Sequence, residues 1–522
     1  MESIKKYLTA IEPREYQKQI FQTCRNKNTL VILPTGLGKT LIALMLAIDR
    51  LVKFPTSKIL FLAPTRPLIE QHFNYFKKQL PELFGQLELF TGKTDAEKRK
   101  ELWQSADIIF STPQCIGNDV KKRLYDLKNV SLLIEDECHR CFKNYAYTYV
   151  AEVYKEQSEF QRILGLTASP GHEEGKVKKI CESLGIEAVE IRTRESEDVK
   201  NYLQELDFNT IRVEFPEEFK KIRDALKAIY DRKIYELQSR KLLFGNSKIA
   251  LLEAQRKIMK MISVGNKHFN LLVGASTCAQ ALKVSHSLEL IETQTLASLK
   301  AYMEDLFSQA KRNESKAAVN LVKQPEFNQA YTKLMELIAR KVEHPKLLEL
   351  KDIISNEIKD KEKAIVFCQY RDTVAKISQE LNTLPNIKSK VFVGQSKKGT
   401  GKNESGLSQK EQQALVRDFS SGEVNVLVST SIGEEGLDIP EVNLVVFYEP
   451  IPSAIRKIQR AGRTARLCKG KLIILLTEKT RDEVYHWSAF HKEKKMQKII
   501  KDLKEELDSS EDKIKENQEK LF

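Results

Sequence analysis

The sequence predicts an α/β protein in which two parallel-sheet domains are separated by a helical insert. From residue 29 to about 170, short apolar runs rich in β-branched residues alternate with amphipathic helical stretches, and this rhythm returns between about 363 and 490. Such alternation is typical of parallel sheets that helices cover on both faces. Between about 200 and 345, strand-like runs become few and helical patterns dominate. A chain of 522 residues is also too long for one hydrophobic core.

We therefore expect domains at residues 1–200, 201–345 and 346–490, followed by a charged C-terminal segment at 491–522. The strands expected in the first domain are TLVIL, KILFLA, DIIFS, SLLIED and RILGLTA. Those expected in the second sheet domain are KAIVFC, KVFVG, VNVLVST, NLVVFYE and KLIILLTE. Each is a short apolar run, as buried strands are.

The insert is expected to be helical because its apolar residues recur at three- and four-residue steps. In one stretch they form a single apolar stripe made of Phe219, Ile222, Leu226, Ile229 and Tyr230. The C-terminal segment is charged and has only sparse apolar residues. We expect it to be an exposed helix or a frayed tail.

The composition indicates a soluble globular protein, with 41% apolar and 30% charged residues. No apolar run approaches the roughly 20 residues that span a bilayer, and the N-terminus lacks the apolar core of a signal peptide. These features predict a cytoplasmic protein without membrane contact. The formal net charge of +14 favours a polyanionic partner such as nucleic acid, but a Lys-rich solvated surface explains it equally well.

A phosphate-binding loop is predicted between the first strand and the helix after it, in LPTGLGKT. Gly36 and Gly38 would let backbone amides turn towards a phosphate chain, together with the helix N-terminus. Lys39 would reach the β- and γ-phosphates, and Thr40 would hold Mg²⁺. Leu33 stands where the general pattern has Gly or Ala, so the match is partial. The residues expected to bind ATP here are Pro34, Thr35, Gly36, Leu37, Gly38, Lys39 and Thr40.

Two similar sequences are interpreted as decoys. TGKT at 91–94 precedes a charged surface helix, for which Thr94 or Asp95 is a plausible cap. GTGK at 399–402 lacks the hydroxyl residue after its lysine and lies in a polar loop. We expect neither to bind phosphate.

The stretch LLIEDECHRC, residues 132–141, allows two interpretations. Cys138 and Cys141 have the spacing of metal ligands, but a zinc site needs four ligands and no second pair lies nearby. Asp136 and Glu137 follow an apolar strand. Beside a phosphate loop, Asp136 would hold Mg²⁺ and Glu137 would orient and deprotonate the water that attacks the γ-phosphate. We favour the acid pair and expect His139 to link it to the next motif.

Taken in order, PTGLGKT, DECH, TAS at 167–169 and QRAGRTAR at 459–466 resemble the motifs of superfamily 2 helicases. The likeness covers nearly the whole chain and is closest to the helicase part of archaeal Hef, which is related to the Fanconi anaemia M helicase. NYAYTYV, GLTASPG, TSIGEEGLDIPEV and FYEPIPSAIRKIQRAGRTAR are similar to that family. The resemblance implies two RecA-like domains and a thumb-like insert that grips DNA. RIG-I-like and Dicer helicases share the DECH spelling and an insert at the same point.

The resemblance also implies roles for individual residues. Those implied for adenine-side and cleft-facing nucleotide contacts are Arg14, Gln17, Gly436 and Asp438. Those implied for the catalytic face of the second domain are Gln459, Arg463 and Arg466, the two arginines being the candidate fingers. Coupling of hydrolysis to movement is assigned to His139, Thr167 and Ser169. Nucleic-acid backbone contacts are assigned to Thr65, Arg66, Thr112, Gln369, Tyr370, Arg371 and Thr430.

The function expected from these motifs is an ATP- and Mg²⁺-dependent DNA helicase or translocase that acts on forked or branched DNA in replication-fork repair. Such a protein would be associated with the nucleoid, and a sliding clamp or a nuclease is a conceivable partner, although the sequence has no convincing docking motif. The alternative is a double-stranded RNA-stimulated ATPase of the RIG-I-like or Dicer type. Paired cysteines after residue 490, which the zinc-binding domain of such an ATPase would need, are missing. A nucleotide-regulated scaffold without ATP turnover is a further alternative, and the full set of catalytic residues argues against it.

Overall fold

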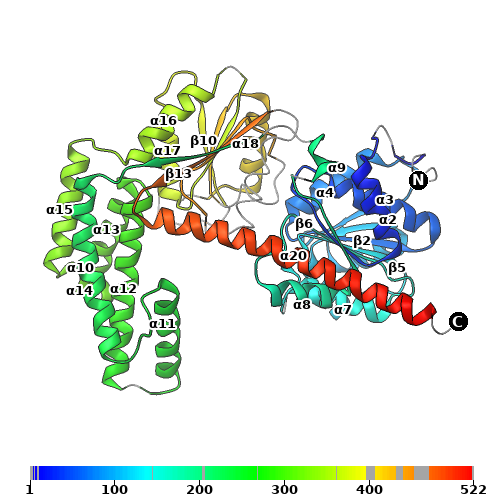
Figure 1. The fold of residues 1–522 in the computed structure, drawn as a ribbon, viewed down its shortest axis with the longest axis horizontal. Coiled ribbons are helices and arrows are strands. Elements are labelled where there is room, and N and C mark those ends of the chain that lie inside the picture. The colour runs from blue at the N-terminus through cyan, green and yellow to red at the C-terminus, as the bar shows by residue number, and fades with distance from the viewer. Residues whose placement is uncertain are drawn as a thin grey trace.

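The computed structural model describes the chain except for residues 1–3, 5, 9, 10, 144, 195, 203–205, 267, 360, 395–405, 431–438, 452–468 and 520–522. At 508 and 510–519 it describes the backbone alone. Figure 1 shows two sheet domains, a helical lobe beside the second of them, and a long C-terminal helix that runs from the helical lobe across to the first sheet domain.

The first domain is built on a seven-stranded parallel sheet in the order β3-β4-β2-β5-β6-β1-β7. Its strands are β1 Thr29–Ile32, β2 Lys58–Leu62, β3 Leu87–Phe90, β4 Ile108–Ser111, β5 Val130–Asp136, β6 Ile163–Thr167 and β7 Ala188–Ile191. The five apolar runs predicted as strands are confirmed. The sequence reading did not anticipate β3 and β7, which are the two edge strands.

Helices cover both faces of this sheet, as the alternating pattern predicts. One apolar core lies under α2 Glu15–Asn26, α3 Lys39–Lys53 and α4 Arg66–Gln79. The core on the opposite face is covered by α5 Ala96–Ser105, α6 Pro113–Lys121, α7 Ala146–Gln157 and α8 Glu174–Leu184. A 3₁₀ turn, Cys138–Arg140, and a short α9, Glu197–Lys200, complete the domain. Because the strands are parallel, their carboxyl ends share one edge.

The second domain contains a six-stranded sheet in the order β10-β11-β9-β12-β13-β8. Its strands are β8 Leu206–Val213, β9 Ala364–Phe367, β10 Ser389–Phe392, β11 Val426–Ser429, β12 Leu444–Phe447 and β13 Gly470–Thr477. The helices packed on it include α16 Pro345–Glu357, α17 Arg371–Leu381 and α18 Gln409–Ser421. The five runs predicted for this sheet are strands.

The strand β8 corrects the expected start of the insert at residue 201. Residues 206–213 pair in parallel with β13 along its whole length and form an edge of the second sheet. This strand is only partly buried, so it lacks the continuous apolar run by which the other strands are recognised. The helical part of the insert therefore begins after it.

The insert is a helical bundle, as predicted. Its helices are α10 Glu217–Ser239, α11 Lys248–Ser263, α12 Phe269–Thr293, α13 Leu296–Lys311, α14 Lys316–Val322 and α15 Pro325–Ala339. Of the predicted stripe on α10, Phe219, Ile222, Leu226 and Ile229 are fully buried, and Tyr230 packs partly buried against the same core. The three- and four-residue spacing thus places the predicted face inside the bundle.

The C-terminal helix α20, Arg481–Glu519, is not the exposed helix or frayed tail that its composition predicts. Its residues Met496, Ile499, Ile500 and Leu503 are buried in the core of the first domain, over β7 and α8. They stand at three- and four-residue steps, so a few apolar residues suffice to make one continuous buried face. Among the described residues, no helix is both long enough and apolar enough to cross a membrane.

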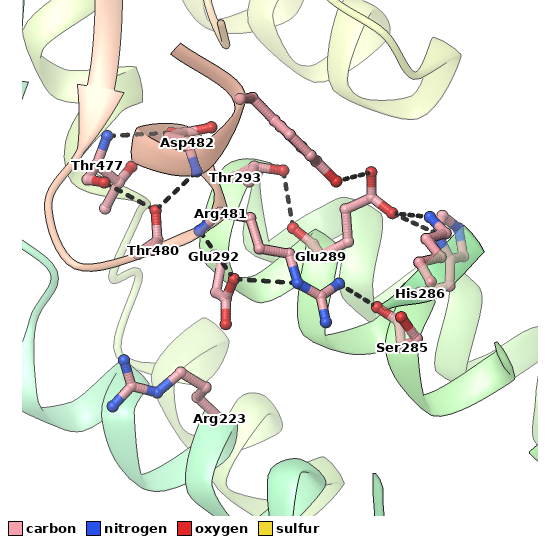
Figure 2. Close-up of polar contacts among 12 residues, drawn as sticks. Arg223, Ser285, His286, Glu289, Glu292, Thr293, Thr477, Thr480, Arg481 and Asp482 are labelled. Atoms are coloured by element: carbon pink, nitrogen blue, oxygen red, sulfur yellow. Dashed lines mark hydrogen bonds and ion pairs between the residues drawn. The ribbon is translucent and has the colours of Figure 1, made fainter. Parts of the chain in front are cut away.

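A largely buried polar junction, defined here by Glu289 and Glu292 of α12 and Arg481 and Tyr485 of α20, joins the insert to α20. Figure 2 shows Glu289, Glu292 and Arg481 of this junction. Arg481 donates through its backbone N–H to Glu292 at 3.2 Å and through its guanidinium to the Ser285 carbonyl at 2.5 Å. Glu289 accepts from Lys248 at 2.7 Å and from Tyr485 at 3.3 Å.

The charge state of the junction is set by its cations. Burial raises the pKa of Glu289. Hydrogen bonds from His286 and Lys248 and the charges of Lys248 and Arg481 outweigh this effect and lower the pKa to about 2. Beside it, Lys346 of α16 pairs at 2.8 Å with Asp482, and both side chains are fully buried. The insert, the second sheet and the start of α20 are thereby tied into one polar network.

Candidate nucleotide site

The predicted phosphate loop lies at the carboxyl end of β1 and leads directly into α3. Gly36 and Gly38 have φ values of 86° and 76°, a backbone region that residues with a Cβ rarely adopt. A Cβ added to Gly38 would lie 2.3 Å from Nε2 of Gln17. The left-handed turn requires glycine, and a Cβ at Gly38 would in addition displace the Gln17 amide. The turn places the first amides of α3 at the open end of the loop.

The helix α2 holds this loop from one side. Gln17 donates through Nε2 to the Leu37 carbonyl at 3.1 Å, and the Tyr16 hydroxyl donates to the same carbonyl at 2.8 Å. The Arg14 backbone N–H donates to Oε1 of Gln17 at 2.9 Å, which orients the amide, and the Arg14 guanidinium lies over the Tyr202 ring. Arg14 and Gln17 thus lie beside the loop. The role of Tyr16 was missed because an aromatic residue at this place resembles ordinary core.

Two side chains of the loop face its interior. Lys39 donates from Nζ to the Leu33 carbonyl at 2.8 Å and to the Pro34 carbonyl at 3.5 Å, so its ammonium lies over the base of the loop. The Thr35 hydroxyl is buried and has no hydrogen-bond partner within the described part of the chain. These groups, with the backbone amides, suit a polyphosphate.

Asp136 ends β5, two strands from β1, and contacts His72 of α4. Nε2 of His72 lies 2.7 Å from Oδ2 of Asp136, and Nδ1 lies 3.4 Å from the Thr40 hydroxyl. Burial raises the pKa of Asp136, but the hydrogen bond from His72 and the charge of Lys39 lower it more, leaving the pKa below its ordinary value. Asp136 and Thr40 offer carboxylate and hydroxyl oxygens beside a phosphate loop. This donor set fits Mg²⁺, which prefers hard oxygen ligands.

Glu137 and the coupling residues form one path of close contacts, in which His139, Thr167 and Ser169 are hydrogen-bonded. Glu137 has a left-handed backbone, with φ of 53°, which strains a residue other than glycine. Its Oε2 lies 3.2 Å from Nδ1 of His139, and this nitrogen lies 3.1 Å from the Thr167 hydroxyl. Thr167 itself donates to the Ser169 carbonyl, so Nδ1 is the donor to Thr167. A path thus runs from the acid pair to the TAS segment.

The path ends at the C-terminal helix. The Ser169 hydroxyl donates to the Met496 sulfur of α20 at 2.8 Å, and both residues are buried. Sequence reasoning missed Met496 because the partner lies 327 residues away. The only available signal was the apolar spacing in the last charged segment.

Cys138 and Cys141 are both buried beneath the acid pair. Burial raises the pKa of both thiols well above the ordinary value. Within the described ranges, no three histidine, cysteine or acidic side chains are grouped so as to hold a metal ion. The thiols pack as apolar groups at the strand end.

The residues assigned to nucleic-acid contact lie after strands of both sheets. Thr65 and Arg66 follow β2 and Thr112 follows β4, all on the edge that carries the phosphate loop. In the second domain, Gln369 after β9 is exposed, and Thr430 after β11 is buried. These positions do not test contact with nucleic acid, so the assignments stay predictions.

Tyr370 and Arg371 are less open. The Tyr370 ring lies 5.3 Å from that of His286 in the insert, and its hydroxyl meets Glu289 of the junction. Arg371 donates to the Gly394 carbonyl at 3.4 Å. In this conformation Tyr370 joins the second domain to the insert and does not point to open solvent.

Some predicted residues lie outside the described part of the chain. They are Gly436, Asp438, Gln459, Arg463 and Arg466. The decoy GTGK at 399–402 does as well. The other decoy, TGKT, precedes α5, whose N-terminus is capped by Asp95 through the Glu97 backbone N–H.

Family models match most of the chain. A DEAD/DEAH box helicase model matches residues 14–177, and a helicase conserved C-terminal domain model matches 345–468. Residues 218–344 between them match a helical bundle of a putative ATP-dependent RNA helicase. The bounds of this bundle agree with α10 to α15.

Solved and curated relatives extend the likeness. The crystal structure of the Pyrococcus furiosus Hef helicase domain is 41% identical, with a TM-score of 0.69 over 91% of this chain and 98% of that one. A putative ATP-dependent RNA helicase of Methanocaldococcus jannaschii is 40% identical over 94% of this chain and 61% of its own length. An ATP-dependent DNA helicase of Schizosaccharomyces pombe is 32% identical over 89% and 57%. The mouse Fanconi anemia group M protein homolog is 30% identical over 93% and 26%. The chain thus spans under two thirds of these curated relatives.

Proposed function

Because the chain belongs to the superfamily 2 helicases of the Hef and Fanconi anaemia M type, we propose that it hydrolyses ATP to move along and remodel forked or branched DNA in replication-fork repair. The observation that carries this proposal is the path of contacts from the phosphate loop and acid pair to the coupling motif. A site that only bound nucleotide would not need such a path.

ATP is bound at the carboxyl edge of the first sheet. The amides of the glycine loop and the N-terminus of α3 receive the phosphates, and Lys39 turns from the loop carbonyls to the β- and γ-phosphates. Gln17 serves the adenine side. Thr40 and Asp136 hold Mg²⁺, which neutralises charge on the phosphate oxygens when bound.

Glu137 acts on the attacking water. Its carboxylate is nine-tenths buried and lies 3.2 Å from Nδ1 of His139. We assign to it the deprotonation of the attacking water. General-base assistance of this kind contributes roughly 10²–10⁴-fold in rate. His139 and Thr167 then pass any shift of Glu137 to Ser169.

The second sheet domain completes the site. Arg463 and Arg466 are proposed to stabilise the transition-state charge, a contribution of roughly 10³–10⁵ for an arginine finger. A cleft of about 540 Å³ between α4 and α18, bordered by Thr40, His72 and Arg417, separates the described parts of the two domains. Closure of this cleft would tie hydrolysis to domain movement.

The insert is the proposed DNA grip. Its helix α11 presents Arg256, Lys257 and Lys260 to solvent. The only acidic residue of this helix is Glu253. Such a surface attracts the phosphate backbone without reading sequence, so binding is expected to weaken with salt.

DNA is the proposed substrate because the relatives of the Fanconi M type are named as DNA helicases. A second candidate is duplex RNA, which is favoured by the names of the archaeal relative and of the helical-bundle family. The two differ in the nucleic acid that stimulates turnover, not in the ATP site.

Steady-state ATP hydrolysis tests both candidates. The protein would be assayed with Mg²⁺ alone and with single-stranded DNA, duplex DNA, forked DNA and duplex RNA, with Lys39→Ala as the blank. We expect forked DNA to stimulate most, with turnover lost in the blank. Strongest stimulation by duplex RNA would make duplex RNA, not DNA, the substrate. Absence of ATP turnover with every nucleic acid would overturn the assignment as an enzyme.

A further inference from the structure

His72 connects the two oxygen ligands proposed for Mg²⁺. It lies on α4, outside the residues that the sequence assigns to the nucleotide site, yet its imidazole reaches Asp136 at the end of β5 and Thr40 at the start of α3. The His72 side chain is 8% exposed and that of Asp136 7%. A buried ring between two such groups is an uncommon placement for a residue that only fills the core.

The two ring nitrogens suit these partners. An ionised carboxylate only accepts, so Nε2 donates to Oδ2 of Asp136 at 2.7 Å. In the neutral ring, Nδ1 accepts the hydrogen of the Thr40 hydroxyl at 3.4 Å. The Asp136 carboxylate also accepts from the Glu137 backbone N–H, and its remaining lone pairs and those of the Thr40 oxygen are then available to a metal ion. Both ligands are therefore oriented by one ring.

Packing fixes the ring in this position. The Phe61 ring of β2 lies 4.6 Å from that of His72, with an angle of 33° between the planes, and Phe61 is fully buried. The open side of the ring borders the cleft of about 540 Å³ between α4 and α18.

We propose that His72 is a positioning residue of the magnesium site, which holds the Asp136 carboxylate and the Thr40 hydroxyl so that their remaining lone pairs meet the hydrated Mg²⁺ of ATP. This inference rests on the proposed function of Asp136 and Thr40 as metal ligands. Partners that orient metal ligands typically contribute 10–100-fold in metal affinity.

A positioning role differs from direct ligation in its metal preference. Mg²⁺ takes oxygen ligands almost exclusively, whereas Mn²⁺, as a transition-metal ion, accepts an imidazole nitrogen more readily than Mg²⁺ does. If His72 only orients oxygen ligands, its loss weakens the binding of Mg²⁺ and of Mn²⁺ by similar factors. If its nitrogen were a ligand, its loss would weaken the binding of Mn²⁺ far more than that of Mg²⁺.

The test uses the full chain and a fluorescent ATP analogue, mant-ATP, whose binding is followed against Mg²⁺ and, separately, Mn²⁺. His72→Phe keeps the ring packing and removes both hydrogen bonds, whereas His72→Gln keeps one donor and one acceptor. Asp136→Asn tests whether Asp136 is a metal ligand. Lys77→Ala, an exposed change on α4, is the control. Binding of mant-ATP without metal checks that each variant is folded.

We expect His72→Phe to raise the half-saturating concentration of both metals by about 10–100-fold, with partial recovery in His72→Gln. A change below about 3-fold, with Asp136→Asn strongly impaired, would overturn the role of His72 and leave the proposed function intact. A loss confined to Mn²⁺ would overturn positioning in favour of ligation. If Asp136→Asn also bound both metals normally, the proposed magnesium site itself would be wrong.

Discussion

Ile500 of α20 provides a direct test of how the C-terminal helix is attached. Its side chain is 4% exposed and belongs to the core of the first domain, although the helix starts at the insert junction. Replacement of a buried isoleucine by alanine costs about 2–5 kcal/mol. Because Ile500 lies on the one face of α20 that packs on the first domain, Ile500→Ala should act mainly on docking of α20. At the lower bound, the docked fraction relative to the undocked one falls by about 30-fold.

Hydrogen exchange measures this effect locally. Amide exchange in the α20 segment that carries Met496 to Leu503 should rise by at least about 30-fold in Ile500→Ala, because opening of the helix precedes exchange. Lys498→Ala, an exposed change on the same helix, should stay close to the wild type. Exchange in Ile500→Ala within about 3-fold of the wild type would refute docking of α20 on the first domain.

Two further predictions concern the phosphate loop and the buried junction. Gly38→Ala should strongly weaken mant-ATP binding, because its φ of 76° strains any residue with a Cβ and this Cβ would also displace the Gln17 amide, whereas Gly92→Ala in the decoy, where nothing lies within 4 Å, should bind normally. Glu289 has a pKa of about 2, below its ordinary 4.5, so its ionised form contributes stability above about pH 4.5 that is lost as pH falls towards 2. Thermal unfolding should therefore give Glu289→Gln a free energy of unfolding about 3 kcal/mol lower than that of the wild type at pH 7. This difference in free energy should narrow below pH 4.5. A gap independent of pH would contradict this reasoning.

The sequence predicted the central strands well because they are continuous apolar runs. It missed the edge strands β3, β7 and β8 because these are only partly buried and contain polar residues. The order of the strands in each sheet could not be predicted from the sequence either. Without knowing that β2 lies beside β5, no pattern could connect His72 with Asp136, although the phosphate loop and DECH were evident as local motifs.

Long-range packing explains the error at the C-terminus. The apolar residues of α20 are too few to predict burial by composition, but they stand on one face. Their partner surface on β7 and α8 is formed more than 300 residues earlier, so only the folded chain reveals it. The path from Glu137 to Ser169 was half predictable, since DECH and TAS are motifs, whereas the contact of Ser169 with Met496 was not.

The most direct test of the proposed activity is strand separation on a fluorescently labelled forked DNA with Mg²⁺ and ATP, comparing the wild type with Glu137→Gln. Equal binding of forked DNA by both proteins would serve as the control for folding. The wild type should separate or remodel the fork in an ATP-dependent manner, and Glu137→Gln should bind ATP and DNA but leave the fork intact. Equal remodelling by Glu137→Gln, or unwinding of duplex RNA with no action on the DNA fork, would contradict an ATP-driven DNA helicase.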